Sequence, residues 1–163
     1  MPEPDPIHID LPNEAATAVL AARLASSLRP GDLIALSGDL GAGKTAFARA
    51  LIHALGAEDE VPSPTFTLLQ TYETSKCAVW HYDLYRIASP DELVELDWEE
   101  ARSGIVLVEW PDRAGGLLPA DRLDVTLAYG PSEGARHATL CPRGAWSTRS
   151  ELRAALQVPG ERE

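Results

Sequence analysis

The sequence is poor in cysteine and in long apolar runs. Its 163 residues include two cysteines, Cys77 and Cys141. So few thiols exclude the disulfide framework of small secreted proteins, and we expect both to be reduced. No run of about twenty apolar residues occurs, which argues against a transmembrane helix. The first residues are acidic and proline-rich, unlike a signal peptide, so we expect a cytoplasmic protein with no membrane partner.

Positive charge is also scarce. Lysine and arginine number 14 against 25 aspartates and glutamates, a formal net charge of -11. Affinity for nucleic acid depends largely on cationic contacts to phosphate, so this chain is not expected to bind DNA, or to hold RNA unaided. If RNA is involved in its function, we expect another chain to hold it.

The length indicates one domain over residues 1–163, with no room for a second of any size. No internal repeat or linker interrupts the pattern. We expect residues 1–8 to be flexible and residues 158–163 to be frayed.

The most informative segment is Gly38-Asp39-Leu40-Gly41-Ala42-Gly43-Lys44-Thr45, a complete G-x-x-x-x-G-K-[ST] phosphate-binding loop. It follows an apolar run at 33–36 and precedes a helical pattern over 45–55, which is the required order of strand, loop and helix. Gly41 and Gly43 allow the backbone N–H groups to turn toward an anion, and the helix N-terminus adds partial positive charge. The segment therefore predicts a nucleoside triphosphate site.

The last two residues of the loop carry the ligand chemistry. Lys44 is predicted to reach the β and γ phosphates, and the Thr45 hydroxyl to ligate Mg²⁺. Lys44 and Lys76 are the only lysines, and arginine supplies the other positive side chains. A lysine at this position suits a phosphate cradle, which accepts a slender point charge better than a planar guanidinium.

Apolar spacing and turn residues predict the other elements. A helix is expected over 13–28 with Asn13 as its N-cap, and strands 65–73 and 77–84 are expected to form an antiparallel hairpin. Ser89-Pro90 begins a helix that runs to about Arg102. The later pattern predicts a buried strand at 105–108, strands near 122–128 and 136–141, and a helix over 148–156. One βαβ crossover and one hairpin predict an α/β, P-loop NTPase-like domain with a mixed, partly parallel central sheet flanked by helices.

Two acidic residues end predicted strands, Glu109 after the run at 105–108 and Asp83 after the aromatic stretch at 79–82. Such sheets bind ligands at the carboxyl ends of their strands, so Glu109 is a candidate Mg²⁺ ligand, direct or through a neighbouring group. For Asp83 two interpretations stay open: a residue that caps a turn, or one that positions water or metal beside the nucleotide. Thr65, which follows Ser63-Pro64, either belongs to a strand-entry turn or senses Mg²⁺ or the γ phosphate through its hydroxyl.

Four further side chains have two interpretations each. His81 lies on the same side of its strand as Asp83, so it is either a supporting partner of the site or a structural histidine, and we favour the structural interpretation. Trp110 supplies either core area or a wall of the site. Arg86 and Arg136 either are solvated or approach a phosphate or a partner carboxylate.

Four segments follow one another along the chain: the phosphate loop at 38–45, Ser63-Pro64-Thr65-Phe66-Thr67-Leu68, His81-Tyr82-Asp83-Leu84-Tyr85-Arg86 and Val108-Glu109-Trp110-Pro111. Together and in this order they resemble the TsaE family of bacterial ATPases required for threonylcarbamoyladenosine modification of tRNA. The resemblance implies an ATP-hydrolysing, Mg²⁺-dependent subunit that works with the TsaB and TsaD proteins and meets tRNA only through that complex.

The resemblance also implies site residues. The nucleotide would be bound by Gly38, Asp39, Leu40, Gly41, Ala42, Gly43, Lys44, Thr45 and Ala46, and at its nucleoside end by Glu14 and Thr17. Asp83, Glu109 and Thr65 would serve hydrolysis, and Thr45 and Glu109 the metal. The chain departs from the family at Ala21, where glycine is common, and at Asp97-Trp98, where a glycine and an aliphatic residue are usual.

Two other functions compete with a slow ATPase. A GTP-regulated switch is disfavoured because no Asn-Lys-x-Asp motif occurs. A small-molecule kinase, the remaining alternative, would need an acceptor pocket and usually a cationic lid, and the sequence has no compact arginine-rich insertion.

Overall fold

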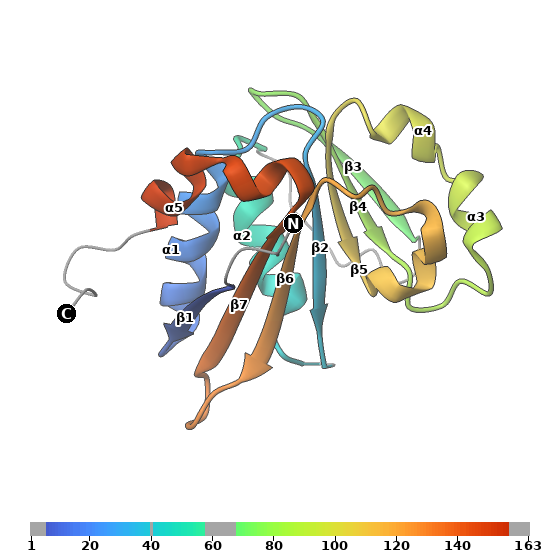
Figure 1. Ribbon diagram of the computed structural model, residues 1–163. Helices are drawn as coiled ribbons and strands as arrows, with labels where there is room; N and C mark the ends of the chain where they lie inside the picture. The colour runs from blue at the N-terminus through green and yellow to red at the C-terminus, as the bar shows by residue number, and fades with distance from the viewer. Residues whose placement is uncertain (1–5, 40, 58–67, 157–163) are drawn as a thin grey trace.

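A computed structural model describes residues 6–39, 41–57 and 68–156 of the chain (Figure 1). In chain order its helices and strands are β1 (Ile7–Leu11), α1 (Glu14–Ala25), β2 (Leu33–Gly38), α2 (Lys44–Ala54), β3 (Leu69–Glu73), β4 (Ala78–Asp83), α3 (Pro90–Val94), α4 (Trp98–Ala101), β5 (Ile105–Glu109), β6 (Arg122–Tyr129), β7 (Arg136–Arg143) and α5 (Ser150–Leu156). Two 3₁₀ segments, Pro111–Leu117 and Gly144–Thr148, follow β5 and β7.

The strands form one seven-stranded sheet in the order β1-β7-β6-β2-β5-β4-β3. β2 is parallel to both β5 and β6, and β4 is parallel to β5. The pairs β1–β7, β6–β7 and β3–β4 are antiparallel. The expected mixed, partly parallel sheet flanked by helices is confirmed.

Helices cover the two faces of the sheet unequally. α1 and α2 pack together on one face, with α5 against α1, whereas α3 and α4 lie toward the β3 side of the sheet (Figure 1). Alternate residues of β5 serve the two cores: Ile105 and Leu107 belong to the core under α1 and α2, and Val106 and Val108 to the other. Glu109 continues this alternation. Its side chain therefore lies on the α2 side, where the phosphate loop enters its helix.

Local sequence signals explain several element boundaries. Asn13 is the N-cap of α1, and its side chain accepts a hydrogen bond from the Ala16 N–H at 2.9 Å, as predicted. Gly56 follows α2 with φ of 111°, the left-handed conformation expected of a residue that ends a helix. Cys77 and Cys141 are both free thiols, also as expected.

The first strand was missed. We expected residues 1–8 to be flexible, but Ile7 and His8 belong to β1, which pairs with β7. Ile7, Ile9 and Leu11 alternate with the polar His8 and Asp10, a period-two pattern that is typical of a strand and that we overlooked. Residues 1–5 and 158–163, part of the same expectation, lie outside the described residues.

The prediction of a single helix from Ser89 to about Arg102 is wrong. The structure has two short helices, α3 and α4, separated by Asp97 at φ 61° and ψ 34°. A right-handed helix cannot continue through a left-handed residue. The resemblance described above implied a glycine at this position, and aspartate is among the residues that tolerate a left-handed conformation best. Asp97 therefore suits the turn between the two helices.

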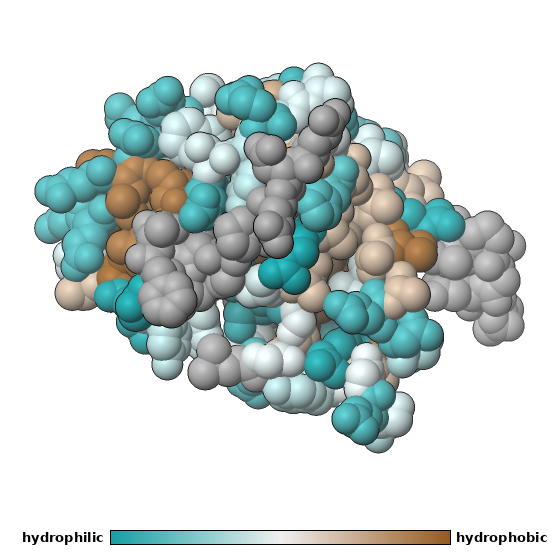
Figure 2. Space-filling view, turned by 180° about the vertical axis from the view of Figure 1, so that it is seen from behind, coloured by the Kyte–Doolittle hydropathy of each residue, from teal (hydrophilic) through white to brown (hydrophobic). Residues whose placement is uncertain are grey.

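Figure 2 shows the face of the molecule opposite to that in Figure 1. This face is mostly hydrophilic, and its apolar residues are gathered in small separate areas. Four large hydrophobic side chains are exposed among the described residues: Val19, Tyr85, Val94 and Tyr129. Within residues 6–39, 41–57 and 68–156, no helix has the length and apolar character needed to cross a membrane.

Candidate nucleotide site

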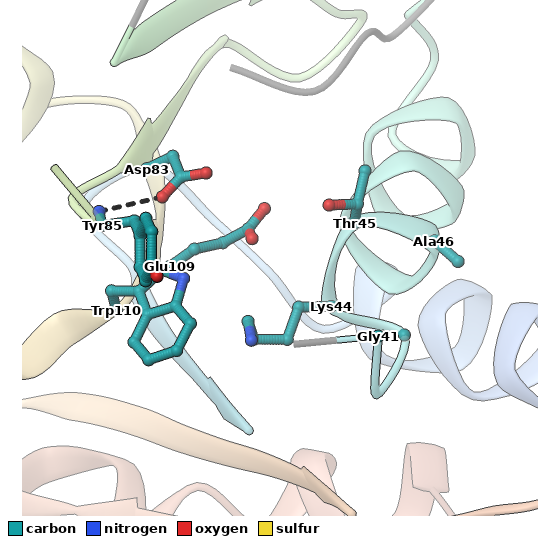
Figure 3. A pocket seen from close by; sticks show the side chains of 9 residues that line it. Gly41, Lys44, Thr45, Ala46, Asp83, Tyr85, Glu109 and Trp110 are labelled. Carbon is teal, nitrogen blue, oxygen red and sulfur yellow. Dashed lines mark hydrogen bonds between the residues drawn. The ribbon is translucent and has the colours of Figure 1, made fainter. Parts of the chain in front are cut away.

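The phosphate loop and both predicted carboxylates meet at one edge of the sheet. Glu109 is in register with Leu36 on one side and with Asp83 on the other, so β2, β5 and β4 end together. A cavity of about 320 Å³ opens at this edge and is lined by Gly41, Gly43, Lys44, Thr45, Ala46, Asp83, Tyr85, Glu109 and Trp110. Figure 3 shows the carboxylates of Asp83 and Glu109 facing Thr45 across it.

Glycine is required at two points of the loop. Gly38 has φ of 143°, and a Cβ there would lie 2.4 Å from the Leu127 carbonyl oxygen of β6. Gly43 is the N-cap of α2 in a left-handed conformation, with φ of 102°. This turn directs the chain into α2 and places the helix N-terminus at the cavity, where it favours an anion. Leu40, a predicted nucleotide contact, lies outside the described residues.

Lys44 lies across the loop and is almost buried, at 5% exposure. Its Nζ donates to the carbonyl oxygens of Gly38 at 2.5 Å and Asp39 at 3.2 Å, and lies 4.4 Å from the centre of the Trp110 ring. Burial lowers the pKa of Lys44 below its ordinary value, against the opposing effect of Glu109, Asp83 and Asp39. The ammonium is thus a desolvated charge beside the cavity, where its attraction for a phosphate is screened less than in water.

Glu109 is held by His81. Both are buried, at 3% and 0% exposure, and His81 Nε2 lies 2.7 Å from Glu109 Oε2. An ionised carboxylate only accepts hydrogen bonds, so the contact requires the proton on Nε2. The other ring nitrogen, Nδ1, is buried and has no hydrogen-bond partner within the described chain. His81 therefore aligns the Glu109 carboxylate. From the sequence we favoured a purely structural histidine, although the two-residue spacing between His81 and Asp83 already indicated that both face the same side of the strand.

Asp83 fits both of its interpretations. Its Oδ1 accepts a hydrogen bond from the Tyr85 N–H at 3.0 Å, which is the turn contact, and its side chain also lines the cavity at 5% exposure. The turn contact orients the carboxylate, so capping and positioning do not exclude each other. Its part in hydrolysis stays a prediction. Thr65 lies outside the described residues, and its role stays a prediction as well.

Aromatic side chains form the wall opposite α2. Trp110 has φ of 59°, a left-handed conformation, and its ring lies 4.9 Å from that of Tyr85. Arg113 lies 5.7 Å from the Tyr85 ring centre. Trp110 packs against the core and also lines the cavity, so its side chain supplies both core area and a wall of the site.

The predicted nucleoside residues lie in a second hollow. Glu14 and Thr17 line a cavity of about 230 Å³ between α1 and α2, together with Ala46, Arg49 and His53. Ala46 lines both cavities, so the two adjoin at the start of α2. The structure thus brings the predicted phosphate and nucleoside residues to neighbouring hollows. Arg49 and His53 were not predicted, since no motif marks them.

The residues present fit Mg²⁺ bound together with a nucleotide. Magnesium usually takes one or two carboxylates, phosphate oxygens and several waters. Thr45 and Glu109 supply a hydroxyl and a carboxylate from opposite walls of the cavity (Figure 3). Among the residues that the structure describes, no group of three or more His, Cys, Asp or Glu side chains could hold a metal ion by itself. These donors fit a metal whose coordination is completed by the nucleotide and water.

The fold and the site define the class of P-loop NTPase-like proteins: a glycine loop between a parallel strand and a helix, with acidic residues at the neighbouring strand ends. Residues 11–138 match the sequence model of the family described as threonylcarbamoyl adenosine biosynthesis protein TsaE. The chain therefore belongs to the TsaE family.

Individual relatives agree with this assignment. The tRNA threonylcarbamoyladenosine biosynthesis protein TsaE of Rickettsia felis is 50% identical over 119 residues, covering 72% of this chain and 70% of the relative. The protein of the same name in Bacillus subtilis is 36% identical over 115 residues, covering 71% and 73%. The crystal structure of B. subtilis YdiB matches with a TM-score of 0.76 and 27% identity, over 93% of this chain and 94% of that one.

Proposed function

We propose that the protein is a Mg²⁺-dependent ATPase that serves threonylcarbamoyladenosine modification of tRNA. Membership of the TsaE family supports the place in this biosynthesis. The observation that carries the enzymatic proposal is the cavity in which Lys44 and Thr45 of a complete phosphate loop face Asp83 and Glu109. This arrangement joins phosphate binding to a metal site and to a carboxylate that can orient water.

The phosphates are bound by the loop and by Lys44. The N-terminus of α2 and the loop N–H groups attract the anion, and Lys44 exchanges its contacts with the Gly38 and Asp39 carbonyls for the β and γ phosphate oxygens. Trp110 lies against the lysine and keeps it beside the cavity. Binding thus uses a donor that is already in place.

Thr45 and Glu109 would hold the metal, and His81 keeps the Glu109 carboxylate in one orientation. Mg²⁺, when bound, neutralises charge that develops on the β and γ phosphates. Each of the three side chains acts by position and charge, not by covalent chemistry.

Asp83 orients the attacking water. The water oxygen bonds to the γ phosphorus as the bond to the β–γ bridging oxygen breaks, giving ADP, inorganic phosphate and a proton. Because Asp83 is anchored by the Tyr85 N–H, its carboxylate is directed into the cavity before substrate arrives. Such positioning accounts for most of what a protein can contribute to phosphoryl transfer.

We further propose that TsaB and TsaD are the partners and that tRNA is met only through them, in the cytoplasm. The net charge of -11 supports an indirect role, since few cations are available for the RNA backbone. Hydrolysis would then drive or reset a complex whose other chains act on the RNA. We expect weak ATPase activity in isolation and a rise when TsaB and TsaD are added.

Three variants test the site by calorimetry with ATP and by release of inorganic phosphate. Lys44→Ala should abolish measurable ATP binding. Glu109→Ala should lose Mg²⁺-dependent hydrolysis with an unchanged circular dichroism spectrum, and Asp83→Ala should bind ATP but turn over slowly. Lys76→Ala is the matched control, because it removes the other lysine side chain of the sequence at a position outside the cavity lining. Lys76 donates instead to the carbonyl oxygens of Ala25, the last residue of α1, and of Leu28.

Unchanged ATP affinity of Lys44→Ala, or full activity of Glu109→Ala, would contradict the proposal. Phosphate transfer to an added small molecule, with no release to water, would favour the kinase alternative. A wild-type rate that TsaB and TsaD leave unchanged would count against the proposed partners.

A further inference from the structure

Arg136 of β7 bonds the outer side of the phosphate loop. Its Nε donates to the Ala42 carbonyl oxygen at 3.1 Å, and its Nη2 to the Gly41 carbonyl oxygen at 3.2 Å. Arg136 is not among the residues that line the phosphate cavity, whereas Gly41 and Gly43 are. The guanidinium therefore bonds the loop carbonyls without lining the cavity.

Its two bonds orient consecutive peptide groups. In a trans peptide the C=O and the following N–H point in opposite directions. The bond to the Ala42 oxygen therefore turns the Gly43 N–H away from Arg136, toward the side on which Gly43 meets the cavity. The neighbouring peptide is fixed from both ends, because the Ala42 N–H donates to the Asp39 oxygen at 3.0 Å while Arg136 bonds the Gly41 oxygen.

Arg136 is itself held on the β6–β7 hairpin. Its Nη1 donates to the Ala135 carbonyl oxygen at 2.8 Å, and its guanidinium lies 4.9 Å from the centre of the Tyr129 ring, its partner in the strand register. The same tyrosine abuts the loop, since a Cβ on Gly41 would lie 2.7 Å from the Tyr129 hydroxyl. An arginine ordered in this way loses little side-chain freedom when it bonds the loop.

We propose that Arg136 is a positioning residue for the nucleotide phosphates, acting through the loop backbone without touching the ligand. It holds the Ala42 carbonyl away from the anion, so that the Gly43 N–H is directed at the anion before it binds, and it fixes the Gly41 peptide, whose Ala42 N–H closes the turn on Asp39. This inference rests on the proposed nucleotide function of the loop. It assigns a role to a residue on a strand that carries no part of the phosphate motif.

The experiment compares Arg136→Ala, Arg136→Lys and Arg143→Ala. Arg143 is the matched control: it lies at the other end of β7 and pairs with Asp124, away from the loop. Calorimetry measures ATP and adenosine affinities, and hydrogen exchange of the Ala42 amide is followed in the protein without nucleotide. Circular dichroism checks that each variant is folded.

For Arg136→Ala we expect ATP affinity to fall by about ten- to a hundredfold, with adenosine affinity nearly unchanged, because a loop without its two charge-assisted hydrogen bonds must be ordered when ATP binds. Arg136→Lys should recover only part of this loss, because an ammonium keeps the charge but cannot bond both carbonyls with a planar fork. Both substitutions should speed exchange of the Ala42 amide. Arg143→Ala should leave affinity and exchange unchanged.

Wild-type ATP affinity in Arg136→Ala would overturn the proposal, as would full recovery by lysine, which would make charge alone sufficient. Unchanged Ala42 exchange in a folded Arg136→Ala protein would also overturn it. The exchange measurement needs no ligand, so it tests Arg136 even if the wild-type chain does not bind ATP. Failure of the wild-type chain to bind ATP would refute the proposed function of the protein but would leave the role of Arg136 in holding the loop backbone intact.

Discussion

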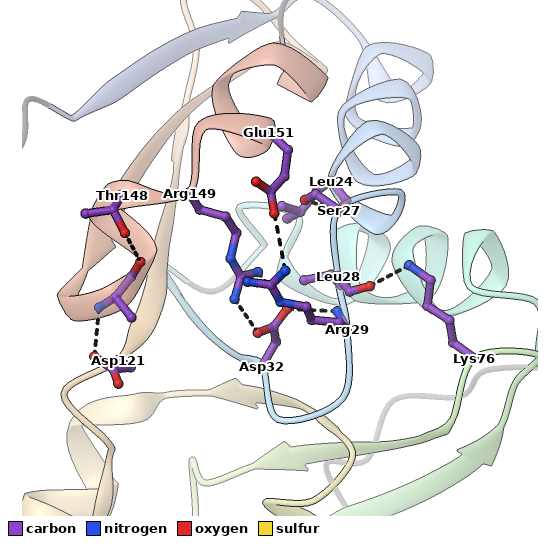
Figure 4. Close-up of polar contacts among 11 residues, drawn as sticks. Leu24, Ser27, Leu28, Arg29, Asp32, Lys76, Asp121, Thr148, Arg149 and Glu151 are labelled. Atoms are coloured by element: carbon purple, nitrogen blue, oxygen red, sulfur yellow. Dashed lines mark hydrogen bonds and ion pairs between the residues drawn. The ribbon is translucent and has the colours of Figure 1, made fainter.

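A buried ion pair anchors the C-terminal segment to the strand that carries the phosphate loop. Arg149 donates to both oxygens of Asp32, at 2.7 and 2.8 Å, and the two side chains are only 8% and 6% exposed (Figure 4). The Asp32 hydrogen bond also raises the pKa of the Arg149 guanidinium. The arginine stacks on Trp146 at 3.8 Å, and Asp32 accepts a further bond from the Arg29 N–H at 2.9 Å. We predict that Arg149→Ala is among the most destabilising single changes outside the core.

The magnitude follows from burial. Removing one partner of a buried pair leaves an uncompensated charge and costs about 3–5 kcal/mol. That is a large share of the roughly 5–15 kcal/mol by which domains are stable. At about 2–4 °C per kcal/mol for a chain of this size, the melting temperature should fall by roughly 6–20 °C. Urea unfolding should show a lower midpoint with an unchanged slope.

The adjacent surface pair provides the control. Arg29 Nη1 lies 3.4 Å from Glu151 Oε2, with side chains 61% and 52% exposed (Figure 4). Solvent screening limits such a pair to about 0–1 kcal/mol, so Arg29→Ala should hardly change the midpoint. The double variant Asp32→Ala with Arg149→Ala should be less destabilised than the sum of its single changes, because no charge is left unpaired. If Arg149→Ala unfolds at the same urea concentration as Arg29→Ala, the reasoning is refuted.

Four further substitutions, at three positions, test the site and one turn. Gly38→Ala should lose ATP binding and lower the melting temperature, because its Cβ would lie 2.4 Å from a backbone oxygen at φ 143°; normal ATP affinity by calorimetry would contradict this. His81→Ala should raise the Mg²⁺ concentration for half-maximal ATPase activity by about 10–100-fold, since Glu109 loses the partner that orients it, and an unchanged Mg²⁺ titration would refute the assignment. Asp97→Gly should be neutral or slightly stabilising at φ 61°, whereas Asp97→Val should destabilise by about 1–2 kcal/mol. Equal thermal stability of the two Asp97 variants would show that this conformation carries no strain.

Signals that are local along the chain predicted the fold well. The cap at Asn13, the glycines of the loop and the unbroken apolar run before Glu109 act within a few residues, so the sequence alone indicates α1, the strand–loop–helix unit and a buried β5. The break at Asp97 was missed, because its left-handed conformation interrupts a segment that otherwise has helical start signals. The alternation in β1 was overlooked, whereas its pairing with β7, more than a hundred residues away, has no local signal.

The sequence by itself determined which functional groups the proposed site can use: a phosphate loop, a hydroxyl and acidic strand ends, together with a family resemblance that the comparisons confirm. Only the tertiary structure decided which side chains from distant parts of the chain meet at that site. Parallel pairing brings Asp83 level with Glu109, burial closes His81 onto Glu109, and the hairpin carries Arg136 to the loop across more than ninety residues. These contacts depend on which strands pair and in what register, and both are decided by segments that lie far apart in the sequence.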